Sequence, residues 1–303
     1  MFNDKQLQYF LCVYEERNIT MAAKKLFISQ PALSRVIRDL ERTVGTELFL
    51  RDKEGVQPTQ AGTVYYKCCR QLLNMHQDAL RKIQDLRDSN SGYIRLGLSS
   101  LSGEFLLPKF LKGFQAEFPG VELRLTEAHI NQLNSLLLQG TIDMALTYDT
   151  QEPELEYEKI LEDQVYVDAP ESFYTHQPDW HYGFSNPPLS PSLLNGKPMI
   201  LLKPNRGMRS IADRLIDSYQ LKPKIILETD SMVLAHKLVL NNEGFTLIPK
   251  LISRGFSDSA QGVYYELEQY PMCRTLYLAT RRHTYHTKAQ EALARWIRKA
   301  AEE

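Results

Sequence analysis

The sequence lacks a long apolar run, a cysteine framework and an excess of charge of either sign. No stretch of about 18 consecutive apolar residues occurs, so we expect no membrane-spanning helix. The first residues lack the basic start and apolar run of a signal peptide, and we therefore expect a cytoplasmic protein. The four cysteines (Cys12, Cys68, Cys69 and Cys273) form no C-x-x-C pair and no Cys/His spacing typical of a metal site. We expect them to be reduced, mostly packed thiols.

Charge is divided unevenly along the chain, although the net charge is only −1. Residues 1–90 hold 14 Lys and Arg against 11 Asp and Glu, whereas residues 91–303 hold 22 against 26. A slightly basic front segment before an acidic remainder is compatible with a nucleic-acid-binding head. With 303 residues, 43% of them hydrophobic, the chain is long enough for two or three globular domains.

The first sixty residues predict short helices followed by a hairpin. Apolar residues recur at helical spacing over residues 7–14. Asn18 and Ser29 are typical caps of a second and a third helix, and Pro31 falls in a first turn, where its missing N–H costs little. Residues 45–59 then predict two short extended arms around a glycine turn. This order is typical of a winged helix-turn-helix.

A longer helix is predicted from Thr59 to about Asp88. One apolar seam runs along it, formed by Tyr65, Cys68, Leu72, Met75, Ala79, Ile83 and Leu86. Such a seam is buried more easily against a partner helix than against the helix's own small domain. We therefore expect a homodimer or a homotetramer. Residues 89–92 then predict a hinge.

From residue 93 onward the pattern changes to alternating strands and helices. Strand patterns occur at residues 94–98, 121–125, 142–146, 199–202, 225–227, 245–248 and 276–279, and an amphipathic helix ends the chain. This alternation predicts parallel βαβ units. Residues 176–191, rich in Pro, Ser and aromatics, predict a loop packed by its own rings.

Two stretches of the front segment, NITMAAKKL at 18–26 and SQPALSRVIRDLE at 29–41, strongly resemble the N-terminal domain of LysR-type transcriptional regulators. GTELFLR at 45–51 and PTQAG at 58–62 continue the resemblance. Residues 118–143 and 242–249 look like the effector-binding domain of that family. The resemblance implies a winged helix-turn-helix domain (1–58), a linker helix for dimerisation (59–88), a hinge (89–92) and an α/β effector-binding domain (93–303). That domain should have two lobes, like type II periplasmic binding proteins, with lobe I at about 93–163 and 268–303 and lobe II at about 164–267.

The third helix carries the candidate DNA contacts. A recognition helix fits the major groove, and its N-terminal half reaches the base edges. Gln30 can pair with adenine, Arg35 or Arg38 with guanine or phosphate, and Arg51 of the hairpin with phosphate. The complete candidate set is Ser29, Gln30, Pro31, Ser34, Arg35, Arg38 and Arg51. An alternative remains open for the two helix arginines, which would form solvated ion pairs with Asp39 or Glu41 instead.

The resemblance also implies a ligand cleft between the two lobes. Two strand-to-helix junctions, Ser99-Ser100 and Asn205-Arg206, should face each other there, and a helix N-terminus with free N–H groups favours an anion. The candidate effector contacts are Ser99, Ser100, Leu101, His129, Thr147, Tyr148, Asn205, Arg206 and Thr229. The serines are alternatively plain N-caps, and Arg206 a surface residue. Relatives often have an arginine at the position of Tyr148, which favours one anionic group over two in the effector.

We therefore predict a cytoplasmic, sequence-specific regulator that binds double-stranded operator DNA and responds to a small anionic metabolite. We expect no enzyme, cofactor or metal. Neither a Walker A nor a G-x-G-x-x-G motif occurs. Ser185, His181 and Asp179 are the residue types of a hydrolase triad, but they lie in one aromatic loop and not at the strand–turn–helix that such a nucleophile requires. The alternative is a cytoplasmic solute-binding or enzymatic α/β protein that uses its helix-turn-helix only for oligomerisation. Retention on random DNA with steep salt dependence distinguishes the two.

Overall fold

The computed structural model describes residues 4–52, 55–148, 152–204, 207–253 and 262–302. The chain divides into two compact units, Met1–Ile83 and Gln84–Glu303. Of the helices in these ranges, none combines the length and the hydropathy needed to cross a bilayer.

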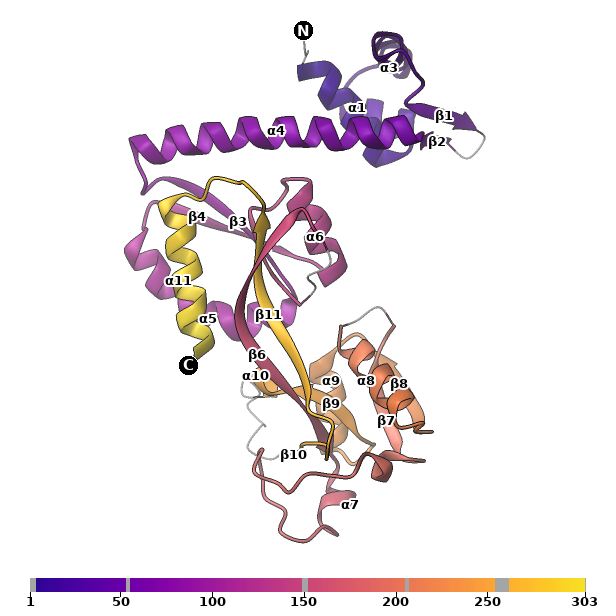
Figure 1. Ribbon diagram of the computed structural model, residues 1–303, viewed down its shortest axis with the longest axis vertical. Helices are drawn as coiled ribbons and strands as arrows, with labels where there is room; N and C mark the ends of the chain where they lie inside the picture. Colours follow the sequence, from indigo (N-terminus) through magenta and orange to yellow (C-terminus); the bar gives the residue numbers. More distant parts are fainter. Residues whose placement is uncertain (1–3, 53–54, 149–151, 205–206, 254–261, 303) are drawn as a thin grey trace. The chain divides into compact units, whose positions relative to one another are not determined.

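The first unit begins with three helices, α1 (Asp4–Glu16), α2 (Ile19–Lys25) and α3 (Gln30–Val44) (Figure 1). The predicted caps are in place: the Asn18 side chain accepts from the N–H groups of Thr20 and Met21 at 2.9 and 3.0 Å. The Ser29 hydroxyl accepts from the Ala32 N–H at 3.4 Å. The helices bury one shared core, which includes Phe10, Val13, Ala22, Ala23, Leu33 and Ile37.

A two-stranded antiparallel wing follows, made of β1 (Phe49–Asp52) and β2 (Gly55–Pro58). Glu41 ties the end of α3 to this wing, because its carboxylate accepts from the N–H groups of Leu48 and Phe49 at 2.9 and 3.1 Å. Gly55 has a φ of 136°, and a Cβ there would lie 2.8 Å from the Arg17 carbonyl oxygen, so the turn requires glycine. The predicted winged helix-turn-helix is confirmed.

The long helix α4 (Gln60–Arg87) has 28 residues and a length of roughly 42 Å. Tyr65, which the sequence assigns to the exposed seam, instead packs into the head, with its ring centroid 4.9 Å from that of Phe10. The helix presents position 65 to α1, so the exposed seam begins only after this first contact. Farther along, Leu72, Met75 and Ile83 are exposed to solvent.

The second unit is organised by a seven-stranded sheet in the order β10-β6-β11-β5-β3-β4, with β9 also paired to β6. Its strands are β3 (Gly92–Leu98), β4 (Val121–Glu127), β5 (Met144–Thr147), β6 (Leu155–Ala169), β9 (Thr246–Pro249), β10 (Val263–Tyr265) and β11 (Met272–Arg281). The predicted parallel pairing holds for β3 with β4 and β5. It does not hold for β9 and β11, which pair antiparallel with β6, a long strand that the sequence analysis did not predict; β6 and β11 lie side by side through the unit (Figure 1).

Lobe I is built around the first part of this sheet. Three helices pack on it: α5 (Ser100–Glu117), α6 (Ile130–Leu138) and α11 (Lys288–Glu302). Helices α5 and α11 share a core that includes Leu96, Phe110, Phe114, Leu146, Leu293 and Ile297. Helix α6 packs in a separate core, where Leu133 and Leu137 meet Ala145 and Leu155. The contact of α5 with α11 is close enough that a Cβ on Gly113 would lie 2.4 Å from the ring of Trp296.

Lobe II contains a second, parallel pair of strands, β7 (Pro198–Leu202) and β8 (Lys224–Thr229). Its helices are α7 (Glu171–Tyr174), α8 (Gly207–Ser218), α9 (Met232–Leu240), α10 (Lys250–Ser253) and the short 3-10 helix η1 (Pro191–Leu194). The aromatic loop packs partly on itself, with Trp180 5.3 Å from Tyr182 between ring centroids. It also enters the lobe core, because Phe184 stacks on Tyr264 at 4.5 Å.

The two lobes meet in two ways. Strands β6 and β11 run from one lobe into the other as a single ladder, from the pair Leu155–Arg281 to the pair Val165–Met272. In addition, Leu101 and Phe105 of α5, a lobe I helix, pack against the apolar core of lobe II. The N-terminal turns of α5 therefore lie at the junction of the lobes. This architecture confirms the predicted two-lobed α/β domain.

Candidate nucleic-acid interface and effector site

The N-terminal half of α3 forms an exposed polar surface on the head. Ser29, Gln30 and Pro31 are exposed, and the Arg35 side chain keeps 82% of its accessible surface. Arg38 is also exposed one turn farther along. Arg51 lies in β1, and its side chain is outside the described residues.

The acidic residues of α3 contact the wing and the arginines of the same helix. Glu41 binds the wing, and Asp39 lies 3.2 Å from Arg42. Arg35 comes only within 4.0 Å of Asp39. The Arg35–Asp39 contact is the solvated ion pair of the alternative interpretation, and the Arg35 side chain stays largely exposed.

Ser34 differs from the surface position expected from the sequence. It is 5% exposed and shares the buried face of α3 with Leu33 and Ile37. Its hydroxyl accepts a hydrogen bond from the Gln30 amide at 3.0 Å. The reason is helical phase: Ser34 follows Leu33 directly, so its short side chain falls at the border of the apolar stripe. In this arrangement Ser34 orients Gln30.

A cluster that the sequence analysis did not identify fixes the head on the first turns of α4. The rings of Tyr14 and Tyr66 stack at 3.9 Å, and the Arg17 guanidinium lies 4.5 Å from the Tyr14 ring. Arg70 covers the Tyr66 ring and pairs with Glu15. The sequence signal for this cluster is the run Tyr14-Glu15-Glu16-Arg17 at the end of α1.

At the second candidate site, Ser99 caps α5. Its hydroxyl accepts from the Ser102 N–H at 3.3 Å and lies 3.0 Å from the Ser102 hydroxyl. The same Ser102 side chain lies near enough to Tyr148 to oppose the rise in the pKa of its phenol. The structure thus joins Ser99 and Tyr148 through Ser102, a buried residue that the sequence analysis missed. Ser100 begins α5, but its side chain is outside the described residues.

Tyr148 also contacts a cation that sequence analysis did not place there. The Arg274 guanidinium, from β11, lies 4.0 Å from the Tyr148 ring. Arg274 donates twice to the Asp163 carboxylate of β6, at 2.8 and 3.0 Å, and Asp163 also accepts from the Leu251 N–H. Burial raises the pKa of Tyr148, against the opposing effects of Arg274 and Ser102. The phenol therefore stays protonated at neutral pH and remains a hydrogen-bond donor.

The remaining predicted effector residues occupy separate places. Thr147 is fully buried at the end of β5, and His129 is the exposed N-cap of α6. Thr229 ends β8, where its hydroxyl accepts from the Ser231 N–H at 3.1 Å. Asn205 and Arg206 lie outside the described residues. The facing of two junctions across the cleft therefore stays a prediction.

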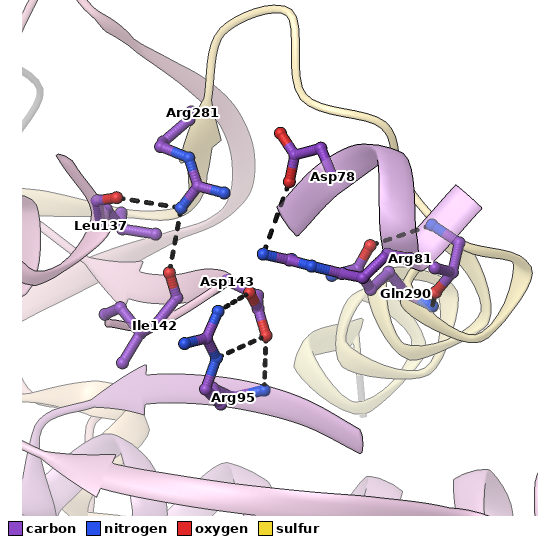
Figure 2. Close-up of polar contacts among 9 residues, drawn as sticks. Asp78, Arg81, Arg95, Leu137, Ile142, Asp143, Arg281 and Gln290 are labelled. Carbon is purple, nitrogen blue, oxygen red and sulfur yellow. Dashed lines mark hydrogen bonds and ion pairs between the residues drawn. The ribbon is translucent and has the colours of Figure 1, made fainter. Parts of the chain in front are cut away.

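Buried polar contacts hold the strand that carries Thr147 and Tyr148 (Figure 2). Arg95 of β3 donates to both oxygens of Asp143 at 2.6 and 3.1 Å, and the Arg95 N–H adds a third bond at 2.9 Å. Arg281 donates to the carbonyl oxygens of Leu137 and Ile142 at 3.0 and 3.2 Å. These contacts fix the connection between α6 and β5, and with it the start of β5.

A cavity of about 510 Å³ lies elsewhere in lobe I. Its lining includes Glu156, Tyr157 and Glu158 of β6 and Glu291, Arg295 and Arg298 of α11. None of the predicted effector residues lines it. It is therefore a separate feature from the junction of the lobes.

Comparison with known protein families decides the identity of these sites. Residues 5–63 match the model described as "Bacterial regulatory helix-turn-helix protein, lysR family". Residues 87–302, more than half of the chain, match the "LysR substrate binding domain". The chain belongs to the LysR family.

Relatives and solved structures agree with this LysR-type assignment. The HTH-type transcriptional regulator YnfL of Escherichia coli is 30% identical over 255 residues, which cover 82% of this chain and 83% of YnfL. A full-length OxyR variant of Pseudomonas aeruginosa has a similar fold, with a TM-score of 0.70 at 18% identity, covering 100% of this chain and 95% of OxyR. Full-length CbnR in complex with its target DNA has a TM-score of 0.53 at 19% identity, and the match covers 99% of this chain and 100% of CbnR.

As a LysR-type regulator, the protein binds DNA through its winged helix-turn-helix and responds to an effector through its two-lobed domain. It is a transcriptional regulator, as predicted, and not an enzyme. The alternative in which the helix-turn-helix serves only oligomerisation is not supported, since the family model for the head describes regulators.

Proposed function

We propose that two copies of this regulator bind one operator through α3 and the wing of each head, and that an anionic metabolite bound between the lobes controls this binding. The exposed N-terminal half of α3, which carries Gln30 and Arg35, supports the DNA part. We place the protein in the cytoplasm, where operator DNA and small metabolites are both present.

We also propose domain limits of 1–58, 59–88, 89–92 and 93–303, with lobe I at about 93–163 and 268–303 and lobe II at about 164–267. The division into two compact units supports the separation of head and effector domain. Two of the apolar cores of the second unit, one around Tyr166 and one around Phe110, are separate from each other and support the two lobes.

Arg35 is proposed to read a base, and Arg51 to contact phosphate. Arg35→Ala should weaken operator binding and relax preference at one base pair per half-site, because an arginine–guanine pair contributes about 1–3 kcal/mol of discrimination. Arg51→Ala should weaken all sequences alike and reduce the salt dependence. Titration of both variants against single-base operator variants measures this. Unchanged preference in Arg35→Ala would remove that residue from the readout surface.

The effector is proposed to carry one anionic group, bound at the N-terminus of α5. Donors meet there: the free N–H groups of an 18-residue helix, the Ser99 and Ser102 hydroxyls, and the protonated phenol of Tyr148. Arg274 adds a positive charge that Asp163 largely neutralises. One carboxylate or phosphate matches this balance better than two. Asn205 and Arg206 are proposed to complete the site from lobe II.

Tyr148→Phe tests this assignment with little change of volume. We expect thermal unfolding of the full-length protein to shift upward with one or more members of a panel of monocarboxylates and phosphomonoesters, because a ligand that binds the native state stabilises it. The shift should shrink in Tyr148→Phe and be absent with the matched amides or alcohols. DNA binding without ligand should be unchanged. A response to cations or neutral compounds only, or equal shifts in both proteins, would contradict the assignment.

Assembly is proposed to use the exposed seam of α4. Between positions 68 and 86 the apolar residues recur every three or four positions, as in a helix that pairs with another helix. The members exposed on the described helix are Cys68, Leu72, Met75, Ala79, Ile83 and Leu86. A second copy of the chain supplies the same seam, and a two-fold axis then relates the two heads.

A further inference from the structure

The turn between α2 and α3 contains an unusual residue. Helix α2 ends in a Schellman motif. The Ile28 N–H donates to the Ala23 carbonyl at 3.0 Å, and the Phe27 N–H donates to the Lys24 carbonyl at 3.1 Å. This pattern places one residue in the left-handed conformation, and glycine is normally found there. Here that residue is Phe27, with a φ of 55°. A bulky aromatic side chain is unfavourable in this conformation.

The Phe27 side chain has no stabilising role within the head. It is 95% exposed, the highest exposure among the large apolar side chains of the described residues. Its neighbours Leu26 and Ile28 both pack against the core of the head, whereas Phe27 does not. An aromatic ring in water on an unfavourable backbone lowers the stability of the fold. A residue kept at this cost to stability indicates a function, here the binding of a partner outside the domain.

The position of Phe27 identifies that partner. It precedes Ser29, the N-cap of α3, by two residues, so its Cα lies within about 7.6 Å of the start of the recognition helix. The first turn of such a helix lies at the base edges in the major groove. Ser29, Gln30 and Pro31 are exposed beside it and extend the same surface. Phe27 is therefore continuous with the DNA-binding surface.

We propose that Phe27 is a specificity-determining residue whose ring packs against the 5-methyl group of a thymine in the major groove. A phenyl ring has no hydrogen-bonding group, and the 5-methyl of thymine is the apolar group that distinguishes this base in the major groove. Phe27 thus reads a thymine next to the bases that Gln30 and Arg35 contact. The inference rests on DNA binding by the head, and is independent of any effector.

The test uses the full-length protein and a duplex that this protein selects from a random-sequence library. Each thymine of the selected duplex is replaced in turn by deoxyuridine, which removes only the methyl group. For the wild type, one replacement per half-site should weaken binding about fourfold, the effect of one buried methyl. Phe27→Ala should bind the thymine duplex more weakly and be indifferent to that replacement. Val44→Ala, which shortens an exposed apolar residue at the other end of α3, should behave as wild type.

Phe27→Gly separates readout from folding. Glycine adopts the left-handed conformation readily, so this variant should melt at a higher temperature than the wild type. It should nevertheless lose the distinction between thymine and deoxyuridine. Equal deoxyuridine effects in wild type and Phe27→Ala would overturn the proposal, as would a loss in Phe27→Ala that is uniform over all sequences. Failure of the wild type to select any sequence would overturn DNA recognition by the head as well.

Discussion

Replacement of Leu72 by aspartate is expected to separate the oligomer into single chains and to weaken operator binding by roughly 10²–10⁴-fold. Leu72 is 41% exposed near the middle of the α4 seam, beside Met75 and Cys68. In the paired state, the aspartate would be buried against an apolar partner with no compensating charge. Two heads on one operator gain affinity because the second binds from within the same complex, and this gain is lost in single chains. Light scattering and operator titration measure the two effects.

Gln77→Asp is the matched control for this experiment. Gln77 is exposed on α4, half a helical turn from the seam, and the substitution adds the same charge. Mass and affinity should both remain at wild-type values. An intact oligomer in Leu72→Asp would show that α4 does not pair subunits. A lower oligomer mass with unchanged operator affinity would show that one head suffices for operator binding.

Removal of the Asp143 carboxylate is the second large effect that we expect. Asp143→Ala should lower the free energy of unfolding by about 3–5 kcal/mol, because it leaves the half-buried Arg95 guanidinium without its partner. The Arg95 backbone N–H loses an acceptor as well. Urea denaturation followed by circular dichroism measures the change.

Glu122→Ala is the control that tests whether burial of the Asp143–Arg95 ion pair causes this loss of stability. Glu122 pairs with Arg124 at 2.8 Å on the neighbouring strand β4, but both side chains are more than half exposed. This substitution should leave the urea midpoint unchanged, since exposed ion pairs contribute little. Equal destabilisation by the two substitutions would mean that burial is not the cause.

The sequence predicts the head well because its signals are local. Asn18 and Ser29 cap helices through bonds to residues two and three positions away, and helical spacing alone identifies the buried face. The same reasoning misses β6. The first half of that strand carries exposed charges such as Glu156 and Glu158, whereas its second half, at Val165 and Tyr166, is buried on both faces. Neither a period of two nor a continuous apolar run describes the whole strand.

The proposed effector site is predicted only in part, for a related reason. Ser99 and Tyr148 follow strand ends, and a sequence pattern can locate strand ends. Arg274 reaches Tyr148 because the antiparallel ladder places it opposite Asp163, 111 positions away in the chain. No local pattern encodes that register. Phe27 is missed for a different reason: its left-handed backbone conformation is local, but only the structure shows it.

The route of the chain through the two lobes determines the order in which they can be completed. Lobe I receives β3, β4 and β5 before the chain enters lobe II, and receives β11 and α11 only after leaving it. On the ribosome, the head and then most of lobe II therefore have their elements while lobe I still lacks β11 and α11. Phe110 and Phe114, which later pack in one core with Leu293 and Ile297, remain uncovered until the last helix has been synthesised. The proposed effector junction is completed last, so a nascent chain can hold a folded DNA-binding head before it is able to respond to its effector.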